Sequence, residues 1–244
     1  MARTPAFARY VRRLLGREGR RLGWKPKAGE SLETAGLRGT VLTLLGRYGR
    51  VPWVLRGARR RARAFLADPA KAELATAALA LNLATHEGHV SEPELEAALA
   101  KAGGPYARNV ILGAMGRLPA DKGLKKALAF SLTDAVPLQN KANVFFGTLD
   151  TPAGRRVAIT FLRDHWPTIK KRMGGFFTAI SGLTGAVLGS TCNEADRDLA
   201  EKVITGLKLP GSARDIDKGT ERADQCIALR AFGKKPLARF LRTH

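Results

Sequence analysis

Aromatic residues, cysteines and long apolar runs are all scarce in this sequence. Only 7% of the 244 residues are aromatic, and Ala and Leu dominate the apolar set. That composition favours closely packed helices over a β-sandwich, so we expect an all-α fold. No stretch approaches the roughly 20 uninterrupted apolar residues that cross a bilayer. We therefore expect a soluble chain with no membrane span.

The two cysteines, Cys192 and Cys226, do not form a CxxC pair. Two thiols in a chain of this size do not make a disulfide framework, so we expect two reduced, packed thiols and a cytoplasmic location. The N-terminus lacks the apolar core of a secretory signal. The segment from Met1 to Arg21 is Arg-rich and acid-poor, which is also typical of a mitochondrial targeting peptide, but we interpret it as a helix of the domain.

Acidic residues are scarce in one part of the chain. The net charge is +21, and residues 1–63 hold 17 Lys and Arg against 3 acids. The basic block ends in Arg56, Arg59, Arg60, Arg61 and Arg63, which helical spacing distributes over more than one face. Such a field attracts nucleic acid, an anionic membrane or acidic peptides.

Short helical patterns recur along the whole chain between Gly, Pro, Asp and Asn residues. Leu37, Val41, Leu44 and Tyr48 share one helical face, for example, and Ser91 with Glu94 forms a capping box. The patterns predict about eleven or twelve helices of roughly 10 to 20 residues, joined by short connections that make sequential neighbours antiparallel. We expect a superhelical solenoid of HEAT-like or armadillo-like hairpins, with a compact globular bundle as the alternative.

No segment offers a convincing catalytic or metal site. Zinc hydrolysis needs two His one turn apart, a third ligand and an open position, whereas His86 and His89 are three residues apart with Gly88 between them. We interpret this segment as a helix end followed by a loop. The run from Gly113 to Gly116 lies inside a helical stripe and is interpreted as core. We expect no catalytic residue and no metal ligand in this chain.

Three stretches together resemble one family. The first comprises Leu22-Gly23-Trp24-Lys25-Pro26-Lys27-Ala28-Gly29-Glu30-Ser31, followed by Gly46-Arg47-Tyr48-Gly49; the second runs from Leu128 to Asp134; the third joins Thr151-Pro152-Ala153-Gly154 to Phe161-Leu162-Arg163 and His165-Trp166. Their order and spacing are similar to the C-terminal domain shared by aminopeptidase N, puromycin-sensitive aminopeptidase and the endoplasmic-reticulum aminopeptidases. The resemblance extends from about Phe7 to about Arg230.

The resemblance implies one α-solenoid domain over residues 1–244, with a basic N-terminal part, 1–63, and with the family's earliest hairpins missing before Phe7. In the family this domain is a bowl of helical hairpins that covers a separate catalytic domain. That catalytic domain holds the zinc, so the resemblance implies no cofactor in this chain.

The function that follows is a noncatalytic domain that binds peptide and closes the substrate chamber of a zinc peptidase catalytic domain. Candidate peptide-binding residues, selected by charge alone, are Arg38, Arg56, Arg59, Arg60 and Arg63. The opposing interpretation of the arginine cluster is a solvated helix. Alternative functions are a basic nucleic-acid-binding protein and a protein-interaction scaffold. Against nucleic acid, the few candidate stacking aromatics, Trp24, Tyr48 and Trp53, are better explained as packing residues.

Overall fold

The computed structural model describes residues 4–70, 74–174 and 177–243, and within them the regular structure is entirely helical. Twelve α-helices occur in these ranges, which confirms the all-α prediction. They are α1 (Pro5–Leu22), α2 (Leu32–Arg47), α3 (Pro52–Ala67), α4 (Leu74–His86), α5 (Glu92–Ala100), α6 (Pro105–Met115), α7 (Leu124–Ser131), α8 (Ala142–Thr148), α9 (Pro152–Met173), α10 (Phe177–Gly189), α11 (Glu194–Gly206) and α12 (Ala213–Thr243), with a short 3-10 turn η1 (Leu138–Asn140) before α8.

The helices begin where the sequence signals them. Ser91 and Glu94 form the predicted capping box at the start of α5. The Thr151 hydroxyl accepts a hydrogen bond from the Gly154 amide at 3.0 Å at the start of α9, and Pro152 occupies the first turn. Because these side chains satisfy backbone N–H groups that have no partner within the helix, they fix where each helix starts.

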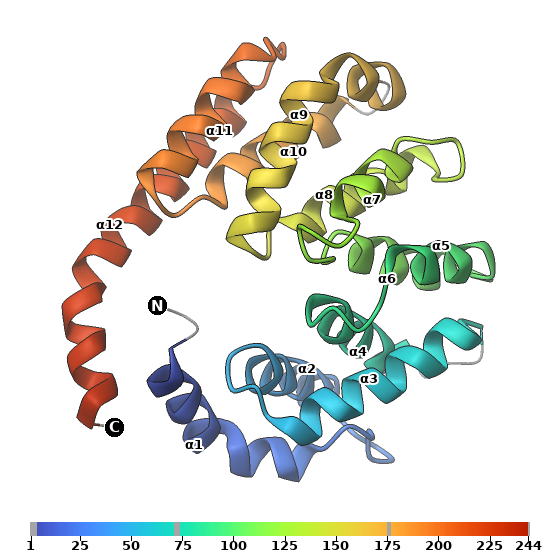
Figure 1. Ribbon diagram of the computed structural model, residues 1–244, viewed down its shortest axis with the longest axis vertical. Coiled ribbons are helices and arrows are strands. Elements are labelled where there is room, and N and C mark those ends of the chain that lie inside the picture. The colour runs from blue at the N-terminus through green and yellow to red at the C-terminus, as the bar shows by residue number, and fades with distance from the viewer. Residues whose placement is uncertain (1–3, 71–73, 175–176, 244) are drawn as a thin grey trace.

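The helices form two rows. Sequential helices pair, α1 with α2 and so on to α11 with α12. Each even-numbered helix from α2 to α10 also contacts the next even-numbered helix. From α3 to α11 the odd-numbered helices contact one another in the same way. Figure 1 shows the even-numbered helices from α2 to α10 on the inner side of a curve. The inner surface is therefore built from the even-numbered row.

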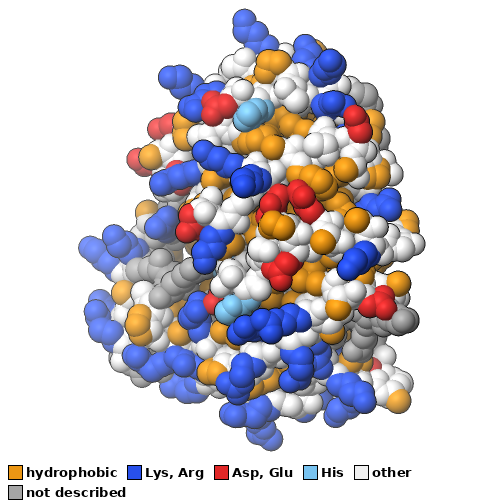
Figure 2. Space-filling model, turned by 45° about the vertical axis from the view of Figure 1, so that its right-hand side comes forward, with side chains coloured by type: hydrophobic (Ala, Val, Ile, Leu, Met, Phe, Trp, Pro, Cys, Tyr) orange, Lys and Arg blue, Asp and Glu red, His pale blue; other side chains and the backbone are white. Residues whose placement is uncertain are grey.

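The two ends of the curve meet. The last turns of α12 reach α1, where Phe240 packs edge-to-face on Tyr10 with ring centroids 5.2 Å apart. In Figure 1, α12 runs along one side of the molecule from α11 toward α1. Figure 2 shows Lys and Arg side chains crowded at the lower end of the molecule, the end where α1 and α3 lie in Figure 1.

The aromatic residues near the N-terminus pack as the sequence indicates. Trp24 is buried in a cluster formed by α1 to α4, and Trp53 packs against the same cluster. Tyr48 contacts Phe7 edge-to-face at 5.9 Å. A Cβ atom at Gly57 would collide with the Trp24 indole, so that glycine makes room for the ring. These aromatics hold the first two hairpins together, as expected of packing residues.

The prediction of two reduced thiols is wrong. Cys192, between α10 and α11, forms a disulfide with Cys226 in α12, with Cα atoms 5.2 Å apart. The reason is that α12 packs along both α10 and α11 and brings Cys226 back to that connection, 34 residues later in the chain. The argument for a reducing cytoplasm, which depended on unpaired thiols, loses its support.

None of the helices in the described ranges is both long enough and apolar enough to cross a membrane.

Candidate functional site: a groove along the inner helix row

Three connected hollows follow the inner row. The first, of about 330 Å³, lies between α2, α4 and the loop after α8, and it shares Gly39 and Thr43 with a hollow of about 430 Å³ along α2. It shares Arg117 with a third, of about 280 Å³, between α6 and α8. We call these three hollows together the inner groove. The polar residues that line it are Thr40, Thr43, Arg47, Asn82, His86, Asn109, Arg117, Asn143 and Asp150.

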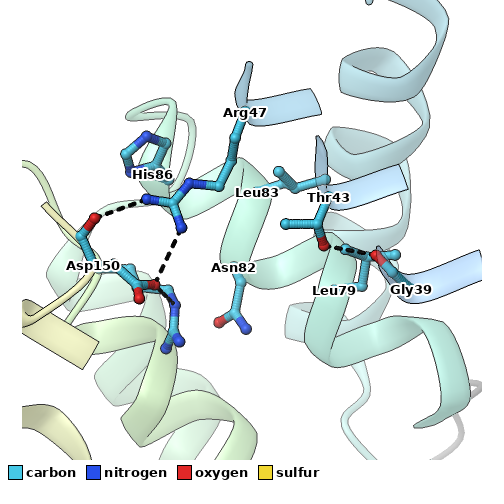
Figure 3. Close-up of a pocket in the computed structure, with 9 residues that line it drawn as sticks. Gly39, Thr43, Arg47, Leu79, Asn82, Leu83, His86 and Asp150 are labelled. Atoms are coloured by element: carbon cyan, nitrogen blue, oxygen red, sulfur yellow. Dashed lines mark hydrogen bonds and ion pairs between the residues drawn. The ribbon is translucent and has the colours of Figure 1, made fainter. Parts of the chain in front are cut away.

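A charged bridge crosses the inner groove. Asp150 follows α8, and its carboxylate lies 2.7 Å from Arg117 Nε and 3.6 Å from Arg47 Nη1. Arg47 also donates to the Asp150 carbonyl at 2.9 Å, and Arg117 donates to the Gly113 carbonyl at 2.6 Å. Figure 3 shows the Arg47–Asp150 pair at one side of the first hollow. Two guanidinium groups share one carboxylate, so the bridge has a net charge of +1.

Asn82 of α4 carries a buried polar atom without a partner. Its Oδ1 is shielded from solvent and accepts no hydrogen bond from the described residues. In Figure 3 the amide is seen between the Arg47–Asp150 pair and the side of Thr43 and Leu79. Buried polar atoms in proteins are nearly always hydrogen-bonded, so an unsatisfied acceptor beside a hollow indicates a place where a ligand or water donates.

The groove between α6 and α8 is shaped by close backbone contact. A Cβ atom at Gly147 would lie 2.6 Å from the Gly113 carbonyl oxygen and 2.8 Å from the Gly116 Cα. This approach brings the two helices close enough for Asn143 to donate its amide to Asn109 Oδ1 at 3.1 Å, and Asn140 donates to the same oxygen. The result is a small cluster of side-chain amides at the groove surface.

Arg38, one of the residues predicted to bind peptide, is placed inside the fold. It is only 2% exposed, and its guanidinium is paired with Glu30 and donates to the Leu22 carbonyl at 3.2 Å and the Gly23 carbonyl at 3.1 Å. The hydrogen bonds from Arg38 hold the pKa of Glu30 below its ordinary value. These contacts tie the chain after α1 to α2, and they enclose the guanidinium away from the surface where a peptide could reach it.

The other candidates, Arg56, Arg59, Arg60 and Arg63, are exposed and share one face of α3 at i, i+3, i+4 and i+7 spacing. Arg61 points to another side, where its guanidinium lies 5.0 Å from the Trp24 ring. The five arginines therefore occupy more than one face, as the spacing predicts. Because α3 belongs to the outer row, none of the four lines the inner groove.

The described residues do not fit a zinc site. They contain no group of three His, Cys, Asp or Glu side chains close enough to hold a metal. His86 ends α4 and His89 is exposed in the loop that follows, as the sequence indicates. Ala114 and Met115 are fully buried in α6, which confirms the interpretation of that segment as core.

Sequence reasoning missed the residues of the inner groove, although one signal was present. Asn is a poor helix former, yet Asn82 and Asn109 stand well inside α4 and α6. A weak helix former at such positions indicates a role outside local structure. The charged bridge had no such signal, since Arg47 and Asp150 are 103 residues apart.

Comparison with known proteins agrees with the resemblance seen in the sequence. The family model for the ERAP1-like C-terminal domain matches residues 1–225. Aminopeptidase M1 of Arabidopsis thaliana is 29% identical to this chain over 208 residues, which is 83% of this chain and 23% of the relative. The chain thus spans less than a quarter of the length of that relative.

Proposed function

Because this chain belongs to the ERAP1-like C-terminal domain family, we propose that it binds peptide and closes the substrate chamber of a zinc aminopeptidase catalytic domain on another part of the protein or on a partner chain. The chain acts as one domain and contributes no catalytic group. The observation that carries this proposal is the inner groove, which follows α2, α4, α6 and α8 in succession. Three adjoining hollows over four helices suit a linear chain better than one compact small molecule.

The arrangement of the helices supports the proposal. Two rows of paired helices, each packed on the next, are what a HEAT-like solenoid requires, and such arrays present their inner row as an extended binding surface. Small changes in the angle between neighbouring pairs would open and close the curve over a chamber. The net positive charge of the Arg47–Asp150–Arg117 bridge favours a peptide with a free carboxylate.

Peptide binding to the purified chain tests the proposal directly. A fluorescein-labelled decapeptide should raise its fluorescence anisotropy on addition of the protein. The purified chain should release no chromophore from an aminoacyl-amide substrate with added zinc. In a separate binding experiment, the chain should associate with a zinc peptidase catalytic domain that lacks its own C-terminal domain. If the chain binds neither the peptide nor the catalytic domain, the proposal is refuted.

The exposed arginine face of α3 supports a second candidate, binding of a nucleic-acid backbone. The two candidates differ in their response to salt. If about six cations contact phosphates, the logarithm of the affinity falls with the logarithm of salt concentration at a slope of roughly −5. A peptide held by one carboxylate and by neutral groups responds far less. Replacing Arg56, Arg59, Arg60 and Arg63 by Gln should abolish DNA binding and leave peptide binding in place.

A further inference from the structure

We infer that the inner groove binds the main chain of an extended polypeptide through the side-chain amides of Asn82, Asn109 and Asn143, and so accepts peptides with little regard to their sequence. This inference rests on the proposed function, and it names the chemical class of the ligand and the groups that hold it. The three residues come from α4, α6 and α8, which are successive helices of the inner row.

The chemistry of the amide side chain matches that of a peptide unit. Asn offers one carbonyl acceptor and two N–H donors, so one side chain can accept from a peptide N–H and donate to a peptide carbonyl. Asn82 Oδ1 receives no hydrogen bond from the described residues and is buried, so a peptide N–H reaches it once the Asn82 side chain turns toward the first hollow that it lines. Asn109 uses its Oδ1 to accept from Asn140 and Asn143, which leaves its Nδ2 group as the donor of that side chain.

The spacing of the helices indicates the conformation of the ligand. Axes of packed helices are about 8–10 Å apart. A polyproline II chain advances about 3.1 Å per residue with three residues per turn, so the same side of its backbone recurs about every 9 Å. A β-strand presents the same side about every 7 Å. Asn109 and Asn143 are hydrogen-bonded to each other at 3.1 Å and so form one contact point, whereas Asn82 on α4 forms a second, one helix away. A step of one helix between two contact points matches every third residue of a polyproline II backbone better than a strand.

The rest of the groove offers little for side-chain selection. Gly36, Gly39, Gly113 and Gly147 line it alongside threonines. Its large apolar groups are Leu44 and Leu79, which are half-buried, Leu83, which is buried, and Phe146, which is 45% exposed. Glycines leave the floor open and give no pocket of defined shape. Backbone contacts therefore dominate recognition, with one aromatic ring available for packing.

Fluorescence anisotropy with two labelled decapeptides of unrelated uncharged sequence, (Ala-Ser)5 and (Gln-Thr)5, tests the inference. Both should bind the full chain within about threefold of each other. Asn82→Ala and Asn143→Ala should each weaken both peptides by about fivefold to tenfold, the loss expected for one or two neutral hydrogen bonds. A sarcosine decamer, which lacks backbone N–H groups, should bind at least tenfold more weakly. Gln225→Ala, an exposed amide on α12, is the matched control and should bind like the parent.

The outcomes separate the inference from the function on which it rests. If both peptides bind and the asparagine variants, folded by circular dichroism, bind them as tightly as the parent, main-chain recognition by these amides is overturned while peptide binding stands. A large preference between the two sequences overturns it in the same way. If neither peptide binds, the peptide-binding part of the proposed function fails together with this inference.

Discussion

Arg47 and Asp150 are 103 residues apart in the sequence and meet across the inner groove, where Arg47 Nη2 donates to the Asp150 carbonyl at 2.9 Å. Arg47 is the last residue of α2, and Asp150 lies between α8 and α9. Along the inner row, α2 contacts α4, α4 contacts α6 and α6 contacts α8, so two helices separate the helix of Arg47 from the helix that precedes Asp150. The contact therefore spans the part of the curve from α2 to α8 and limits how far these helices can spread.

Removing the Asp150 carboxylate should loosen the curve. In Asp150→Ala the guanidinium groups of Arg47 and Arg117 lose their common partner, and we expect the free energy of unfolding to fall by about 1–2 kcal/mol, because these side chains are partly exposed and solvent screens the charges. Urea unfolding followed by circular dichroism measures the change.

Asp164→Ala provides the control for that experiment. Asp164 pairs only with its neighbour in the chain, Arg163, among the ion pairs of the described residues, and both side chains are more than half exposed. Its removal should leave the urea midpoint unchanged or slightly raised, because alanine is the better helix former at this position in α9. Equal effects of the two substitutions would show that the bridge across the groove contributes no more than a surface pair.

Gly147 sets the distance between α6 and α8. In Gly147→Ala the new methyl group would lie 2.6 Å from the Gly113 carbonyl oxygen, which is backbone and has no freedom to turn away. We expect a loss of about 2–3 kcal/mol from overpacking. Gly182→Ala in α10 has open space around the added Cβ and should raise stability by up to about 1 kcal/mol, since alanine is the better helix former. The midpoint of thermal unfolding should therefore fall for Gly147→Ala and rise for Gly182→Ala, relative to the parent. An unchanged midpoint for Gly147→Ala would contradict the close contact.

The buried pair of Glu30 and Arg38 should make stability depend on pH. Hydrogen bonds from Arg38 hold the pKa of Glu30 below its ordinary value of 4.5, so the carboxylate stabilises the fold above that pH and the stabilisation is lost as the pH falls through the lower, folded-state pKa. Glu30→Gln should therefore be less stable than the parent at pH 7, and the difference should shrink on acidification.

Urea midpoints between pH 3 and pH 7 measure this difference. Glu221→Gln, at an exposed position inside α12, is the matched variant and should follow the parent over the whole range. If the difference in urea midpoint between Glu30→Gln and the parent stays constant with pH, the pair stabilises the fold through its packing and not through its charge.

The sequence allowed the helices to be predicted because their signals are local. Apolar stripes and caps such as Ser91 with Glu94 depend on residues a few positions apart, and the structure confirms them. The burial of Arg38 has no local signal. Its partners, Glu30 and the carbonyls of Leu22 and Gly23, meet it only because the loop after α1 folds back on α2.

The candidate site was harder to predict for the same reason. Charge identified Arg56 to Arg63, but charge alone does not tell the inner row from the outer row, and these arginines lie on α3. The inner groove is defined by single residues on four different helices, and its bridge joins positions that only the curvature of the array brings together. Such a site is a property of the packing, which a residue pattern within one helix does not contain.

The disulfide between Cys192 and Cys226 should be measurable as a stability difference. It closes a loop over a sequence separation of 34 residues, for which the chain-entropy model gives about 3–4 kcal/mol. Thermal unfolding of the parent should therefore shift to lower temperature when dithiothreitol is added. The variant with both Cys192→Ser and Cys226→Ser should unfold at the lower temperature with or without the reductant, which separates loss of the bond from other effects of the reagent. Alkylation before reduction should label neither cysteine of the native protein, and labelling of both would contradict the bond and restore the two free thiols that the spacing predicts.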